Sequence, residues 1–111
     1  MTVRNGAITR VHRHIAESDA HGEFIGVAKF SASGAAQLRE HYHQRRTEFA
    51  GRPWREAKLF EKAYFIHLLQ DMIESGRHMA HVDTPVGYIE VDTQEDFEYA
   101  RRNWVENHLS K

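Results

Sequence analysis

Two carboxylates near the carboxyl end of the chain have the residue types and the spacing of a cation site. Glu90 and Asp92 lie two positions apart in residues 86–92, whose alternating apolar and polar residues predict a β-strand. Because successive side chains of a strand point to opposite faces, both carboxylates and Tyr88 are expected on one face. Magnesium prefers oxygen ligands of this kind. The segment therefore predicts a magnesium site, with an ordinary solvated strand face as the alternative.

A helix is predicted directly behind these carboxylates. Thr93 is a typical N-cap residue, and Asp96 follows three positions later, as in a capping box. Glu95 and Asp96 are accordingly expected to serve the cap and the helix dipole, not a metal ion. The residues expected on the inner face of this helix are Phe97, Ala100, Trp104 and His108.

The amino-terminal part of the chain predicts strands. Asn5–Gly6 is a type I′ turn signal. Apolar and polar residues alternate over residues 7–15, which predicts a half-buried strand. Residues 23–30 are almost continuously apolar, as expected for a central strand that is buried on both faces. Gly26 in that strand marks a position where another group could approach the backbone closely.

Two helices are predicted in the middle of the chain. Ser31 or Ser33 caps the first, which has a thin apolar stripe. The second, over about residues 56–74, is apolar almost all the way round and ends at Ser75–Gly76. Such a helix is either the buried centre of a domain or a packing surface for another chain.

The whole pattern has the order ββ-αα-ββ-α, with a further short strand over residues 78–82. It predicts one domain over residues 1–111, of the α/β or α+β class, with a small mixed sheet.

Composition excludes several classes of protein. The chain is 41% hydrophobic and 28% charged, which is ordinary for a globular domain. Its net charge of -1 gives no long-range field for nucleic acid or for an anionic membrane surface. Cysteine is absent, which excludes disulfides and thiolate metal sites. No run approaches the roughly 20 apolar residues of a membrane span, and no signal-peptide core is present, so the expected location is cytoplasmic.

Nine histidines are scattered along the chain. His12 and His14 share one face of a predicted strand, which is the spacing of two zinc ligands, but no third ligand lies nearby in sequence. His41 and His43 do not share a helix face. We expect surface histidines, and a histidine-based metal-binding protein is the least favoured of three hypotheses.

Two segments, read together, resemble the small-molecule nucleotidyltransferases. Residues 22–31, Gly-Glu-Phe-Ile-Gly-Val-Ala-Lys-Phe-Ser, resemble the central strand of cytidylyltransferases that act on phosphocholine or aminoethylphosphonate, including those fused to phosphoenolpyruvate phosphomutase. Residues 87–100 resemble the terminal aromatic-x-Glu-x-Asp-x-x-Glu-Asp-x-x-x-Ala segment of that family, and residues 3–8 resemble its lead-in. The family's glycine-rich nucleotide loop and its mid-chain aspartate have no counterpart here. The chain therefore resembles the C-terminal half of this Rossmann-like fold.

The resemblance implies a magnesium-dependent reaction. A phosphate or phosphonate oxygen of the acceptor attacks the α-phosphate of a nucleoside triphosphate, and pyrophosphate leaves. It also implies that Asp92 is a magnesium ligand with Glu90 beside it, that Glu23 and Gly26 lie along the acceptor pocket, and that Tyr88 lines its wall. Without the nucleotide loop, we expect the isolated chain to bind magnesium poorly and to be inactive.

A second hypothesis is a non-catalytic module, derived from such an enzyme, that oligomerises or binds a partner. Its homodimer would form through the helix around residues 59–73, from Leu59 to Ile73. The first hypothesis expects a nucleoside triphosphate and a small phosphorylated or phosphonate acceptor as partners of the complete enzyme. Neither expects nucleic acid or a membrane.

Overall fold

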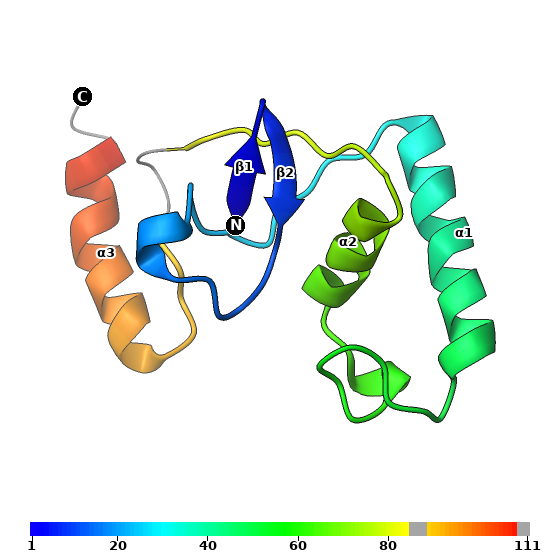
Figure 1. The fold of residues 1–111 in the computed structure, drawn as a ribbon. Coiled ribbons are helices and arrows are strands. Elements are labelled where there is room, and N and C mark those ends of the chain that lie inside the picture. The colour runs from blue at the N-terminus through cyan, green and yellow to red at the C-terminus, as the bar shows by residue number, and fades with distance from the viewer. Residues whose placement is uncertain (85–88, 109–111) are drawn as a thin grey trace. The chain divides into compact units, whose positions relative to one another are not determined.

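A two-stranded antiparallel sheet and three α-helices make up the fold in the computed structural model, which describes residues 1–84 and 89–108 (Figure 1). The strands and helices are β1 (Thr2–Arg4), β2 (Ala7–Arg10), α1 (Ala32–Phe49), α2 (Phe65–Glu74) and α3 (Gln94–His108). Single 3₁₀ turns occur at Glu17–Asp19 and Phe60–Lys62. The chain divides into two units, Met1–His81 and Val82–Lys111. Within the described residues, no helix has both the length and the apolar character needed to cross a membrane.

The hairpin at the amino end forms as predicted. Asn5 and Gly6 have φ angles of 54° and 79°, the left-handed conformations that a type I′ turn requires. Val3 pairs with Ile8 and Arg4 with Ala7, with a register shift before Val3. The prediction of a turn at Asn5–Gly6 is confirmed.

The first residue is tied to a later loop by two backbone hydrogen bonds. The amino group of Met1 donates to the carbonyl of Gly22 at 2.6 Å, and the carbonyl of Met1 accepts from the amide of His21 at 2.9 Å. Burial lowers the pKa of this amino group, an effect that Glu23 partly offsets. The amino end is thereby fixed beside residues 21–22.

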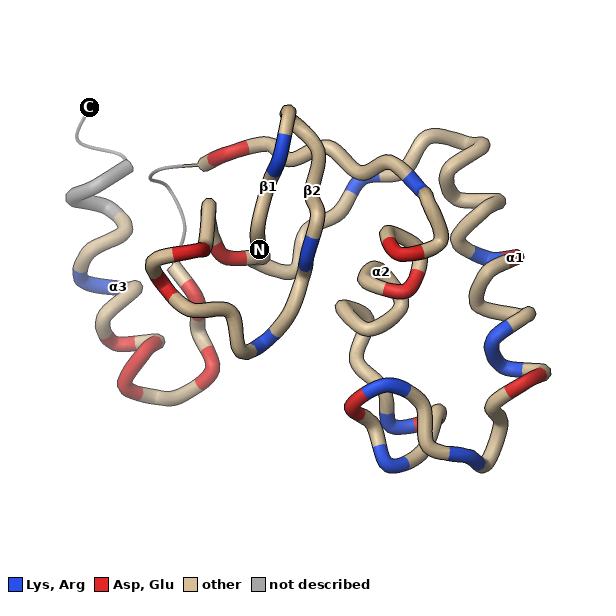
Figure 2. The backbone as a smooth tube through the Cα atoms, viewed as in Figure 1, with Lys and Arg blue, Asp and Glu red and all other residues tan. Residues whose placement is uncertain are grey.

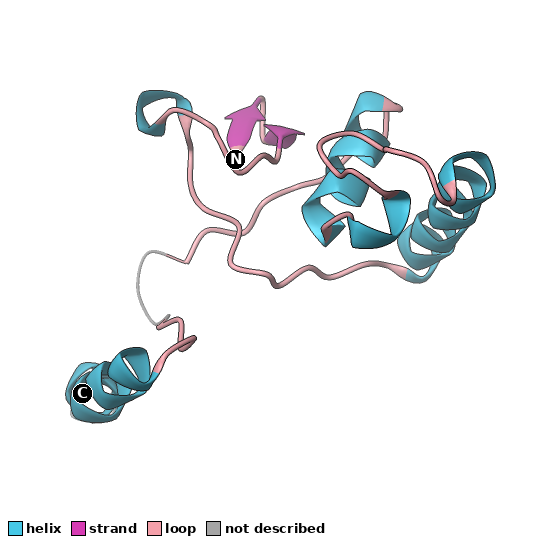
Figure 3. Ribbon diagram, turned by 90° about the horizontal axis from the view of Figure 1, so that it is seen from below, coloured by secondary structure: helices cyan, strands magenta, loops and turns pink. Residues whose placement is uncertain are grey.

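Three of the predicted strands do not form in the described part of the chain. Residues 23–30 lie in a long loop between β2 and α1, which Figure 3 shows, and residues 89–92 also lack strand structure. Residues 78–82 contribute a single bridge, Ala7 to Ala80, beside a hydrogen bond from Ile8 to Met79 of 2.8 Å. The prediction of a central strand over residues 23–30 is wrong for this structure, because a strand needs neighbouring strands to pair with.

Helix α1 begins where its cap predicts. The Ser31 hydroxyl accepts a hydrogen bond from the amide of Gly34 at 3.0 Å, so Ser31, not Ser33, is the N-cap. Helix α2 ends at the predicted glycine cap: Gly76 has a φ of 92°, and the amide of Arg77 donates to the carbonyl of Met72 at 3.0 Å.

The second predicted helix is shorter than expected, because residues 56–64 are not part of it. Trp54 and Ala57 form a bridge, Arg55 has a φ of 52°, and the α-helix begins only at Phe65. The tight turn lets Trp54 and the 3₁₀ turn at Phe60–Lys62 both reach the core. A continuous helix would have projected some of these side chains into water.

The core of the first unit is aromatic and small. Trp54, Phe60, Leu68 and Met72 are buried, and the residues packed around them are Leu38, Phe49, Ala63 and Met79. Helix α2 contacts both β2 and α1, and one of its faces is buried while Phe65 and Glu74 are exposed. Of the two predicted alternatives, the buried centre of the domain or a packing surface for another chain, the buried face of this amphipathic helix supports the first.

In the second unit, the start of α3 has the predicted capping box. The Thr93 hydroxyl accepts from the amide of Asp96 at 3.0 Å, and the Asp96 carboxylate accepts from the amides of Thr93 (3.2 Å) and Asp92 (3.1 Å). The hydrogen bond from the Asp92 amide, with those from Thr93, lowers the pKa of Asp96. Phe97 and Trp104 are 49% and 42% exposed, and the expectation that they lie on the inner face of α3 stays a prediction.

Candidate functional site

The residues predicted to bind substrate in the first unit, Glu23 and Gly26, are both exposed. Gly26 has a φ of 87°, and a side chain built at this position would meet no atom within 4 Å. A glycine is thus needed here for the left-handed backbone conformation, and no other group approaches the backbone closely at this position. Glu23 lies in a shallow pocket with Met1, Val11 and His12, of about 650 Å³.

The predicted magnesium ligands, Glu90 and Asp92, belong to the second unit and are exposed. Residues 89–92 are not a strand, so nothing in the described backbone fixes both carboxylates on one face. The neighbouring carboxylate of Asp96 is already used by the cap of α3. Their role as magnesium ligands stays a prediction. Tyr88 lies outside the described residues.

A histidine–glutamate–histidine cluster, not predicted as a site, joins three parts of the first unit. One oxygen of Glu56 lies 3.1 Å from Nε2 of His12, and the other lies 3.2 Å from Nε2 of His67. The amide of His14 donates to Nδ1 of His12 at 3.0 Å, and the amide of Tyr64 donates to Nδ1 of His67 at 3.1 Å. Each Nδ1 is thus an acceptor, so each Nε2 carries the proton that it donates to Glu56.

Electrostatics agree with this assignment of protons. Burial raises the pKa of Glu56, but hydrogen bonds from its own backbone and from His12 outweigh that effect and leave the pKa lowered. The pKa of His67 is lowered by burial, to which the positive charges of Arg55 and Arg13 add, while Glu56 opposes the shift. Glu56 is therefore an ionised acceptor at neutral pH, and the two Nε2 atoms are donors and not metal ligands. The cluster is suited to holding the fold together.

Asp71 is the centre of a second buried cluster. Its carboxylate accepts from Nε2 of His41 (2.5 Å), Nε of Arg45 (2.6 Å) and Nε of Arg55 (3.0 Å), and Arg55 also pairs with Glu74. Burial raises the pKa of Asp71, but the hydrogen bonds from Arg45, His41 and Arg55 outweigh it and leave the pKa lowered. The cluster connects α1, α2 and the loop between them.

Sequence reasoning missed this second cluster, although one signal was available. His41 and His67 were expected at the surface, but they are only 7% and 6% exposed. Asp71 lies on the apolar face of α2, and a carboxylate in that position requires buried donors. The sequence does not say which of the many basic residues those donors are.

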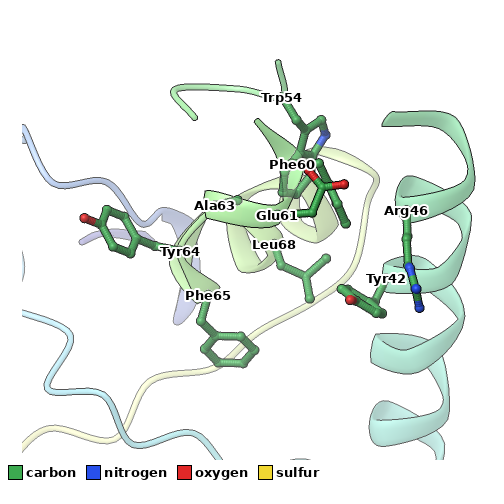
Figure 4. A pocket seen from close by; sticks show the side chains of 9 residues that line it. All are labelled: Tyr42, Arg46, Trp54, Phe60, Glu61, Ala63, Tyr64, Phe65 and Leu68. Atoms are coloured by element: carbon green, nitrogen blue, oxygen red, sulfur yellow. The ribbon is translucent and has the colours of Figure 1, made fainter. Parts of the chain in front are cut away.

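An open pocket of about 480 Å³ lies between α1 and residues 54–68 (Figure 4). Tyr42 and Arg46 extend into it from α1, opposite Leu68 and Phe65. Its other lining residues are Trp54, Phe60, Glu61, Ala63 and Tyr64. Aromatic rings thus dominate the lining, and one guanidinium and one carboxylate are the charged groups.

Comparisons of this chain with protein-family models, with curated proteins and with solved structures gave no match.

Proposed function

We propose that this chain is the substrate- and metal-side C-terminal part of a nucleotidyltransferase-like domain. The complete domain transfers a nucleotidyl group, cytidylyl by the resemblance, to a small phosphorylated or phosphonate acceptor. The isolated chain is inactive, because it carries no counterpart of the glycine-rich loop that holds the triphosphate.

The observation that carries this proposal is that segments with strand-like sequences are left unpaired. In the described parts of residues 22–31 and 87–92, the two segments that carry the resemblance, no strand forms. Two of their large apolar side chains are exposed, Val27 at 75% and Val91 at 48%, and the other large ones described are half-buried, namely Phe24, Ile25, Phe30 and Ile89. Exposed apolar side chains of this kind are what additional strands of a larger sheet would cover. This supports a chain that is completed by another part of a domain.

Pairing with such a part would also order the carboxylates. A strand over residues 86–92 would place Glu90 and Asp92 on one face, directly before the cap of α3. Magnesium bound there would supply charge neutralisation for a triphosphate. On the chain alone both carboxylates are exposed, so weak magnesium binding is expected.

We expect Asp92→Asn to abolish activity that depends on the complete domain. The chain would be combined with a polypeptide that carries the glycine-rich loop, identified from the coding sequence directly upstream of Met1. Pyrophosphate release would be measured with magnesium, a cytidine triphosphate donor, and phosphocholine or aminoethylphosphonate as the acceptor. Loss of a metal ligand is expected to lower the rate by about 100-fold or more.

Glu95→Gln is the matched control, because Glu95 is an exposed carboxylate in the first turn of α3 with no role in the proposed site. Its rate should stay within about twofold of the unmodified chain. Equal rates for Asp92→Asn and Glu95→Gln would remove Asp92 from the site. An upstream frame without a nucleotide loop, and no partner that carries one, would contradict the function itself.

A second candidate function is the non-catalytic module, with a homodimer around residues 59–73. It is favoured by exposed apolar residues at the start of that segment, since Leu59, Tyr64 and Phe65 are 38%, 56% and 44% exposed. Most of α2 beyond Phe65 is buried within the chain, so these three residues are what remains for a partner. This candidate predicts a dimer in size-exclusion chromatography with light scattering, and a monomer at every concentration would contradict it.

A further inference from the structure

Two histidines from distant parts of the first unit lie side by side next to the hairpin. The ring centroids of His21 and His81 are 4.4 Å apart, and the ring planes are inclined at 63°. A ring nitrogen of one histidine lies within 4.8 Å of a ring nitrogen of the other. Two nitrogens that bind one zinc ion, each at about 2.0–2.1 Å, are roughly 3.4 Å apart. A small rotation of the two rings is therefore enough to let both nitrogens bind the same ion.

Backbone hydrogen bonds hold both histidines beside the hairpin. The amide of His21 donates to the carbonyl of Met1 at 2.9 Å, and the amino group of Met1 donates to the carbonyl of Gly22 at 2.6 Å. The residue before His81 forms a bridge with Ala7 of β2. Because the sheet already brings these two segments together, little backbone freedom would be lost when a ligand binds to both side chains.

The loop that carries His21 is acidic. Residues 16–23 contain no lysine or arginine and three carboxylates, those of Glu17, Asp19 and Glu23. Figure 2 shows acidic positions in red along this loop, which follows β2. A local excess of negative charge attracts cations to the surface around it.

A carboxylate oxygen is within reach of the histidine pair through the chain itself. Asp83 follows His81 by two positions, and two residues span at most about 7 Å. Glu23 follows His21 in the same way. Burial lowers the pKa of the Met1 amino group and Glu23 opposes that shift, so the charge of Glu23 already acts on this ammonium. Asp83 is therefore better suited to be the third ligand of a metal ion.

Another pair of neighbouring histidines, His12 and His14, is less suited to a metal ion. Their ring centroids are 5.7 Å apart. Nδ1 of His12 accepts a hydrogen bond from the amide of His14, and Nε2 of His12 donates to Glu56. Both ring nitrogens of His12 are thus used inside the chain, and a metal ion would have to displace one of these hydrogen bonds.

We propose that His21, His81 and Asp83 bind a zinc ion or a similar divalent transition metal ion. Imidazole nitrogens favour zinc, copper and nickel, whereas magnesium and calcium favour sites made of oxygen ligands alone. Three protein ligands leave a coordination position for water or for a further ligand. Within the first unit, the ion would connect the loop after β2 to the segment after α2.

This site goes beyond the proposed transferase function, whose magnesium ligands are Glu90 and Asp92. The two proposals share no ligand and call for metal ions of different chemistry. They can therefore fail independently. Loss of zinc binding says nothing of pyrophosphate release, and the reverse also holds.

The test is zinc binding by the full chain without a polyhistidine handle, measured by competition with a chromophoric chelator. Zinc chloride should bind with one ion per chain and a Kd on the order of 1–100 μM, weaker than a site with four ligands. Millimolar magnesium should not compete. Because zinc binds the folded chain, zinc at about 100 times its Kd should raise the Tm by about 5–10 °C.

His21→Ala and His81→Ala should each raise the Kd for zinc at least about tenfold and remove the increase in Tm. Asp83→Asn should raise the Kd about fivefold or more. The matched controls are His78→Ala, at an exposed histidine of the same segment, and Asp19→Asn, at an exposed carboxylate two positions from His21. Both controls should stay within about twofold of the unmodified chain. Circular dichroism would establish that each variant is folded.

A second measurement uses the unmodified chain and needs no variant. In side-chain ¹H–¹⁵N spectra, the histidine signals that shift on addition of zinc should be those of His21 and His81. Shifts confined to His12 and His14 would place the ion there and overturn the proposal.

Three results of the binding assay would also overturn it. The first is the absence of saturable zinc binding. The second is an equal Kd for His21→Ala and His78→Ala, which would show that the histidine pair does not hold the ion. The third is an equal Kd for Asp83→Asn and Asp19→Asn, which would remove the carboxylate and with it the site of three ligands.

Discussion

Asp71→Ala is expected to lower the free energy of unfolding by about 3–5 kcal/mol, the cost of removing one partner from a buried ionic cluster. The substitution leaves two guanidinium groups, Arg45 and Arg55, facing a site from which their acceptor has gone. It also removes the hydrogen bond of 2.5 Å to His41, which is buried in α1. Urea unfolding followed by far-UV circular dichroism would measure the loss.

The control for this substitution is Glu48→Ala, which removes the exposed partner of the same Arg45. An exposed pair of this kind contributes about 0–1 kcal/mol. Similar losses for Asp71→Ala and Glu48→Ala would contradict a special role for the buried cluster.

The same cluster predicts a dependence of stability on pH. Because the pKa of Asp71 is lowered in the folded state, its contribution is fully present above its unfolded pKa of about 4 and is lost as pH falls through the folded value. Between neutral pH and about pH 3, the Asp71→Asn variant should therefore lose less free energy of unfolding than the unmodified chain does.

Trp54→Ala is the second substitution with a large expected effect, at about 3–5 kcal/mol. Trp54 is 5% exposed, and its ring centroid lies 5.1 Å from that of Phe60 and 6.4 Å from that of Phe49. Its loss would leave a cavity at the point where α1, α2 and their connection meet. In a core of this size, partial or complete unfolding at ordinary temperature is the expected result.

Trp104→Ala provides the matched control, since Trp104 is 42% exposed on α3. It should change the free energy of unfolding by less than about 1 kcal/mol. The two tryptophans also separate the fluorescence signals, because each variant retains only one of them. A Trp54→Ala protein that unfolds at the same urea concentration as Trp104→Ala would show that the core is not where the structure places it.

The parts of the fold that could be predicted are those in which a short stretch determines its own conformation. The turn at Asn5–Gly6, the cap at Ser31, the glycine at Gly76 and the box of Thr93 with Asp96 are all confirmed. In each, a side chain or a glycine satisfies a backbone requirement within about four residues. No distant part of the chain is involved.

The strands over residues 23–30 and 86–92 could not be settled from sequence, because an apolar or alternating pattern becomes a strand only beside another strand. The described residues of both segments remain without strand structure. Of the predicted site, Glu23 and Gly26 are in one unit and Glu90 and Asp92 in the other, so their proposed roles still depend on the complete domain. The clusters around Glu56 and Asp71 depend on contacts between residues that are 11 to 44 positions apart in sequence, from Glu56 with His67 to His12 with Glu56, which local patterns do not encode.

The hydrogen bonds of Met1 have a practical consequence for work with this protein. The free amino group of Met1 donates to the carbonyl of Gly22 at 2.6 Å, and the carbonyl of Met1 accepts a hydrogen bond from the amide of His21. A fusion at the amino end converts the ammonium into an amide with one proton, so the bond to Gly22 survives only if the added polypeptide leaves in one direction. A purification handle placed there would disturb the hydrogen bond between Met1 and Gly22 and would lie beside the loop that contains Glu23. Handles and fluorescent labels are therefore better placed behind α3.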